Sequence, residues 1–150
     1  MTLRVLWLSH IVPFPPIGGV LQRSHNLLAE VARHHQVDLL SFAQRAPLIT
    51  HFGDYDTGID KAQGVLKGIC GEVKFFPISS DCERFGMMRL AAKSLFSRNG
   101  YTIKWLESGQ FGQQLGGLDN VYDVIHFDTI SLAIYRSFFN APAVLNHHNI

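Results

Sequence analysis

The feature that most constrains the fold is an almost unbroken apolar run at residues 3–8, LRVLWL. A strand with one face in water alternates apolar and polar residues, whereas a parallel strand covered by helices on both faces is apolar nearly throughout. The run therefore predicts a strand in the middle of a parallel sheet. Pro13, Pro15 and Pro16 prevent that strand from continuing, and Gly18 and Gly19 permit unusual backbone angles before the next segment.

Short strands then alternate with helices along the chain. Apolar residues recur at helical spacing over residues 20–33, and a second strand-like run follows at 36–42. Further strands are expected at 72–78, 123–127 and 142–146, and further helices at 59–69, 83–96, 103–115 and 130–138. Because crossovers between parallel strands are right-handed, this alternation predicts a Rossmann-like α/β fold, a doubly wound parallel sheet of order 3-2-1-4-5 with helices on both faces.

Composition and charge limit the classes of function. A chain of 150 residues with 47% hydrophobic and 17% charged residues is expected to form one folded domain with its own core. The formal net charge of +1 gives no concentrated basic face, so nucleic acid is not an expected partner.

Cysteine usage and the N-terminal segment bear on location. Cys70 and Cys82 are too few for a disulfide scaffold and are interpreted as reduced thiols. The opening residues run into a strand-like block without a small-residue cleavage site, so no signal sequence is expected, and no apolar run approaches the ~20 residues needed to span a bilayer. We therefore expect a cytoplasmic protein, which could also bind peripherally to the inner face of the membrane.

Polar residues gather at the predicted carboxyl ends of the strands, where ligands bind in open α/β sheets. His10 follows the first strand, His126 and Asp128 end the fourth, and His148 and Asn149 follow the fifth. In the predicted strand order these three ends converge on one cleft.

Gly18 and Gly19 stand where a helix begins. Their backbone N–H groups could contact an anionic group such as a diphosphate, or the glycines could simply allow a tight turn. The residues alone favour neither interpretation. The spacing matches neither the G-x-G-x-x-G fingerprint nor a Walker loop, which argues against a dinucleotide oxidoreductase and an NTPase.

His126 and Asp128 lie two residues apart on an extended segment, so both should point to the same side of the sheet. They could bind hydroxyl groups or move a proton there, although a lone histidine at a strand end is more often structural. The adjacent His147 and His148 would point to opposite faces, and no further ligands have metal-site spacing, so no metal is expected.

The segments LRVLWLSHIVPFPP, Gly18-Gly19 and LLAEVARHHQVDLLSF resemble the start of retaining GT-B glycosyltransferases of family four. DVIHFDTISLAIY and PAVLNHHNI resemble that family's strand-four block and its following "H-N" strand. Many relatives carry H-x-H at strand four, and here Asp128 takes the place of the second histidine.

The resemblance implies an enzyme that moves a sugar from a nucleotide diphosphate sugar to a hydroxyl of a glycan or lipid acceptor, without a metal and with no cofactor besides the donor. It assigns Gly18 and Gly19 to the donor diphosphate and matches His126, whereas Asp128 departs from the family's motif. Together with the strand-end positions, this leads us to predict catalytic roles for His126 and Asp128. His10, Arg23, His148 and Asn149 are predicted to bind substrate.

In that family this segment would be the acceptor-side, N-terminal domain, and a C-terminal domain would bind most of the donor. We therefore expect residues 1–150 to be a truncated domain with little transferase activity alone and a tendency to form homodimers through an exposed edge or interface. A stand-alone α/β module that binds or senses a small ligand is the alternative from another class. An epimerase-like sugar-nucleotide enzyme is a third possibility, for which no catalytic acids can be identified.

Overall fold

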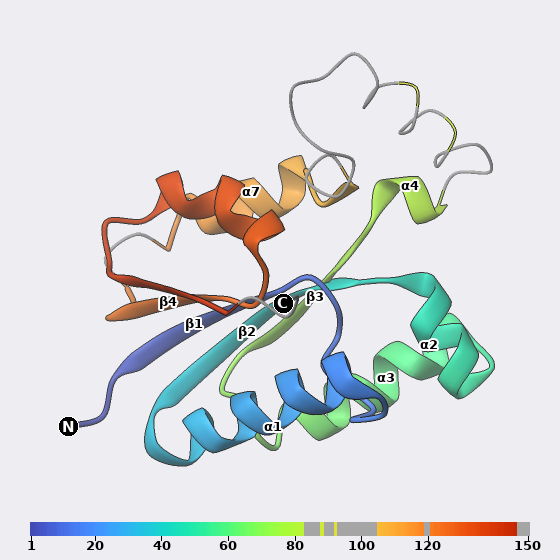
Figure 1. Ribbon diagram of the computed structural model, residues 1–150, viewed down its shortest axis with the longest axis horizontal. Helices are drawn as coiled ribbons and strands as arrows, with labels where there is room; N and C mark the ends of the chain where they lie inside the picture. Colours follow the sequence, from blue (N-terminus) through green and yellow to red (C-terminus); the bar gives the residue numbers. More distant parts are fainter. Residues whose placement is uncertain (83–87, 89–91, 93–104, 119–120, 147–150) are drawn as a thin grey trace.

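The computed structural model describes residues 1–82, 88, 92, 105–118 and 121–146. Its centre is one sheet of five parallel strands in the order β3-β2-β1-β4-β5, which confirms the predicted fold class and strand order (Figure 1). The strands are β1 (Arg4–Ser9), β2 (Gln36–Ala43), β3 (Val73–Pro77), β4 (Val124–Phe127) and β5 (Ala143–Leu145). Each begins and ends within one residue of its prediction, because runs of buried apolar residues define strand ends well.

Helices cover both faces of the sheet. The helices α1 (Gly19–His34), α2 (Arg45–Phe52) and α3 (Tyr55–Leu66) lie on one side, and α7 (Gly109–Leu115) and the 3-10 helix η1 (Ile130–Phe138) lie on the other (Figure 1). The short α4 (Ser79–Cys82) follows β3. This division follows from right-handed crossovers, since the chain moves outward from β1 in one direction and then in the other.

Some helix predictions were wrong in detail. Helix α2 was not predicted, because it buries only Leu48 and so lacks an apolar stripe. Helix α3 begins at Tyr55, not at residue 59, because the Asp54 side chain accepts a hydrogen bond from the Thr57 N–H (2.9 Å) and caps it there. Helix α7 likewise begins after Ser108, which caps it through the Phe111 N–H. Apart from residues 88 and 92, the helix predicted at 83–96 lies outside the described residues.

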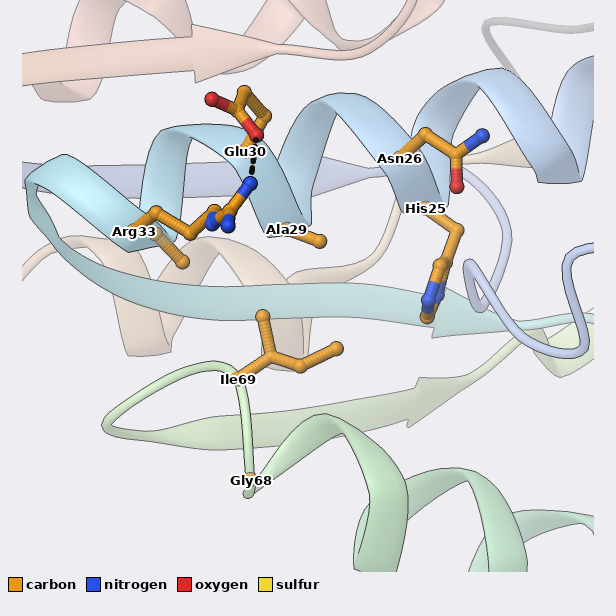
Figure 2. A pocket seen from close by; sticks show the side chains of 8 residues that line it. His25, Asn26, Ala29, Glu30, Arg33, Gly68 and Ile69 are labelled. Atoms are coloured by element: carbon orange, nitrogen blue, oxygen red, sulfur yellow. Dashed lines mark hydrogen bonds and ion pairs between the residues drawn. The ribbon is translucent and has the colours of Figure 1, made fainter.

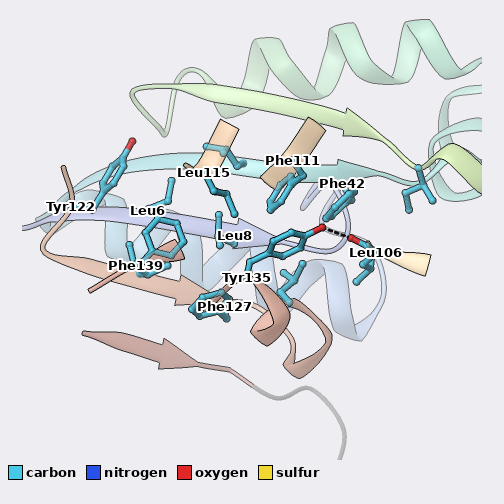
Figure 3. Close-up of a cluster of buried hydrophobic side chains, with 14 residues drawn as sticks. Leu6, Leu8, Phe42, Leu106, Phe111, Leu115, Tyr122, Phe127, Tyr135 and Phe139 are labelled. Atoms are coloured by element: carbon cyan, nitrogen blue, oxygen red, sulfur yellow. Dashed lines mark hydrogen bonds between the residues drawn. The ribbon is translucent and has the colours of Figure 1, made fainter. Parts of the chain in front are cut away.

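The apolar run of β1 divides between two cores. Leu6 and Leu8 face α7 and η1, and Val5 and Trp7 face α1 and α3. Phe111 of α7 occupies the middle of the first core and stacks on Phe42, with ring centroids 4.5 Å apart (Figure 3). Burial on both faces explains why the run contains no apolar-polar alternation.

No helix in the described ranges combines the length and apolar character needed to cross a membrane.

Candidate functional site

A buried carboxylate organises the carboxyl edge of the sheet. Asp128, just after β4, has no exposed surface, and its Oδ2 accepts hydrogen bonds from Ser9 Oγ (3.0 Å) and Ser24 Oγ (2.8 Å). Its backbone N–H donates to the Leu8 carbonyl of β1 (3.0 Å). Asp128 therefore links the ends of β4 and β1 to the second turn of α1.

His10 lies beside this carboxylate. Its Nδ1 is 3.9 Å from Asp128 Oδ2, and 21% of its side chain is exposed, against none of the Asp128 side chain. The His10 carbonyl accepts a hydrogen bond from Gln44 Nε2 (2.9 Å), which fixes the backbone at this point. The structure thus brings together two predicted site residues, His10 and Asp128.

Gly18 and Gly19 begin α1 at the same edge of the sheet. Gly18 is the N-cap residue with φ of 78°, a conformation that favours glycine, so the backbone itself accounts for a glycine at this position. Gly19 has open space where a Cβ would lie, so neither contact nor φ requires a glycine there. The N-cap residue is a glycine without a side chain to cap α1, and the first turn of the helix has no acidic residue. Among the described residues, the first N–H groups of the helix therefore meet no cap from the N-cap position.

Arg23 extends this surface toward β5. Its Nη2 donates to Asn146 Oδ1 (3.1 Å), next to the end of β5, and the Arg23 side chain is exposed. The Asn146 Nδ2 is buried and has no hydrogen-bond partner among the described residues. The predicted residues His148 and Asn149 lie outside the described residues.

His126 occupies different surroundings from Asp128. As the strand period requires, both lie on the α1 side of the sheet, but His126 is 7% exposed and stacks on Trp7, with ring centroids 3.6 Å apart. Its ring helps to line an apolar cavity of about 350 Å³ between β1, β4, β5 and the C-terminal half of α1. Whether His126 takes part in catalysis stays a prediction.

Ser24 is a site residue that the sequence analysis missed. It is fully buried on α1, between Leu21 and Leu28 on the helix face that packs against the sheet. A polar residue inside an apolar stripe was the available signal, because a buried hydroxyl requires a partner. Its partner Asp128 is 104 residues away, which the local sequence does not reveal.

Other hollows lie away from this edge. One of about 580 Å³ lies between α1 and the turn before β3, and Glu30 and Arg33 of α1, which are among its lining residues, pair along the helix at 3.1 Å (Figure 2). Within the described ranges, no three histidine, cysteine, aspartate or glutamate residues are grouped so that they could hold a metal ion.

Comparison with known proteins finds no matching family model, no matching curated protein and no matching solved structure.

Proposed function

We propose that this chain is the acceptor-side domain of an enzyme that transfers a sugar from a nucleotide diphosphate sugar to a hydroxyl group of a glycan or lipid. The observation that carries the proposal is the uncapped start of α1 beside Arg23 at the carboxyl edge of the sheet. Ligands of open α/β sheets bind at this edge.

The start of α1 suits a diphosphate. The first helical hydrogen bond runs from the Gln22 N–H to the Gly18 carbonyl (3.0 Å), so the N–H groups of residues 19–21 have no acceptor within the helix. The positive end of the helix dipole favours an anion there. Arg23, one turn further on, adds a guanidinium that can bind phosphate oxygens through two parallel hydrogen bonds.

The N–H groups at the start of α1 and the Arg23 guanidinium can also stabilise the leaving group of the reaction. When the bond from the anomeric carbon to the diphosphate breaks, the electron pair goes to the leaving oxygen, and donors already in place stabilise that charge without a metal. We propose that a second domain holds the nucleotide and sugar, because transfer requires two substrates to be positioned against each other. Residues 1–150 alone should then show little transfer.

The test is an NMR titration of the ¹⁵N-labelled 150-residue chain with UDP, UDP-glucose and GDP-mannose. The proposal predicts saturable shifts of the Gly18, Gly19 and Arg23 signals with all three ligands, since the diphosphate is common to them. A stand-alone module for an unrelated ligand predicts no response at this end of α1. Absence of these shifts would remove the basis of the proposal.

Arg23→Ala and Arg33→Ala form a matched pair. Both arginines are exposed on α1, but Arg33 lies at the opposite end, paired with Glu30. Loss of charged hydrogen bonds worth about 1.5–3 kcal/mol should weaken diphosphate binding by roughly 10- to 100-fold in Arg23→Ala. Binding to Arg33→Ala should equal that of the unchanged chain, and equal weakening in both variants would indicate non-specific attraction.

A further inference from the structure

We propose that His10 is the group at this edge that binds a ligand hydroxyl, and that Asp128 is a positioning residue that fixes the His10 ring. The sequence analysis predicted a catalytic role for Asp128 itself. The identity of the hydroxyl as one of a sugar or acceptor rests on the proposed function, whereas the pairing of His10 with Asp128 does not.

Burial separates the roles of the two side chains. Asp128 has no exposed surface and already accepts hydrogen bonds from Ser9 and Ser24, so a ligand has no direct access to it. The His10 side chain is 21% exposed, and its Nδ1 lies 3.9 Å from Asp128 Oδ2, close enough for an ion pair but longer than a hydrogen bond. The ligand-accessible group of the pair is therefore the imidazole.

The chemistry of the ring gives the direction of the hydrogen bonds. A carboxylate beside Nδ1 favours the proton on that nitrogen, and the neutral ring then keeps a lone pair on Nε2. Because the two nitrogens lie on different sides of the ring, Nε2 is turned away from the buried carboxylate. It can accept a hydrogen bond from a hydroxyl at the cleft, and a distance such as 3.9 Å can shorten when a ligand binds.

The hydrogen bonds that hold Asp128 in place suit it to orient the His10 ring. Ser9 belongs to β1, Ser24 to α1, and the Asp128 N–H binds the Leu8 carbonyl, so the carboxylate is held from two neighbouring elements. A side chain positioned by such contacts can hold its neighbour in one orientation. Of the other charged or titratable groups, α1 brings Arg23 and His25 to this edge, and both remain in every variant below.

The first experiment is ¹⁵N NMR of the histidine rings in the 150-residue chain. We expect neutral His10 to carry its proton on Nδ1, and Asp128→Asn to lower the His10 pKa, because an opposite charge nearby is lost. Ser24→Ala keeps the carboxylate and should lower the pKa much less. The exposed His51 of α2 is the internal control in all samples.

Two results would overturn the pairing. One is a His10 proton on Nε2 in the unchanged chain, a measurement that needs no variant to fold. The other is an unaltered His10 pKa in a folded Asp128→Asn chain.

The second experiment adds glucose or glycerol as a hydroxyl probe. We expect the His10 Nε2 signal to shift progressively with the probe while the His51 signals stay in place. An unmoved Nε2 signal with both probes would refute hydroxyl binding by His10. If the diphosphate titration gives no shifts while His10 behaves as expected, the transferase proposal is refuted and the pairing of His10 with Asp128 is not. The failure of one proposal can therefore be distinguished from the failure of the other.

Discussion

At the scale of single residues, the hydroxyl of Ser24 tests whether Asp128 really joins α1 to the sheet. Ser24→Ala removes one of two serine hydrogen bonds to a buried carboxylate, and we expect a loss of about 1–3 kcal/mol in unfolding free energy. Ser137→Ala, at an exposed position of η1, is the control and should change stability by less than about 0.5 kcal/mol. Equal effects in urea unfolding of the two variants would contradict the assigned role of Ser24.

The neighbouring glycines should respond oppositely to the same substitution. Gly18 has φ of 78° and ψ of 166°, a region open essentially to glycine alone, so Gly18→Ala should cost about 1–3 kcal/mol. Gly19 is free of contacts at its Cβ position and lies in the helix, so Gly19→Ala should leave stability unchanged or raise it by up to about 1 kcal/mol. Thermal unfolding of both variants checks this, and a costly Gly19→Ala would show that the start of α1 is tighter than described.

At the scale of elements, Phe111 attaches α7 to the sheet. Its ring is fully buried and contacts Phe42, Phe76 and Tyr135. Phe111→Ala should therefore cost about 3–5 kcal/mol. Phe138, on the neighbouring η1, is 37% exposed, and its truncation should cost less than about 1.5 kcal/mol. Comparable losses in chemical unfolding would mean that α7 is not held through the Phe111 ring.

Elements also show where the sequence is informative and where it is not. Strand positions could be predicted because each strand is a short apolar run bounded by polar or turn residues, as at residues 3–8. The start of α3 could not be predicted, because one capping hydrogen bond from the Thr57 N–H to Asp54 decides it.

At the candidate site, the predicted strand ends indicated which residues share an edge of the sheet. The burial of Asp128 depends on Ser24, and only the assembled fold brings these two together.

At the scale of the whole molecule, the free energy of unfolding at alkaline pH should depend on two groups with raised pKa values, the Cys70 thiol and the Tyr122 hydroxyl. Burial, with a smaller contribution from Asp38, raises the pKa of the Cys70 thiol from 9.0 to about 12. Burial and a hydrogen bond to Asp38 also raise the pKa of Tyr122. Because folding favours the protonated thiol, its contribution is complete below pH 9 and is lost as the pH rises toward about 12.

Urea unfolding between pH 8 and pH 11 measures this loss. The stability of Cys70→Ala should decline less steeply with pH than that of the unchanged chain, while Tyr122 maintains part of the slope. Identical slopes for the two chains would show that the native thiol titrates as it does in the unfolded state.

The central claim is that the start of α1 holds the diphosphate of a sugar donor. The most direct measurement is a crystal structure of the 150-residue chain with UDP-glucose. We expect the diphosphate oxygens against the N–H groups of residues 19–21 and the Arg23 guanidinium, with the sugar turned toward His10. A ligand bound elsewhere, for example in the hollow between α1 and the turn before β3, would contradict the account.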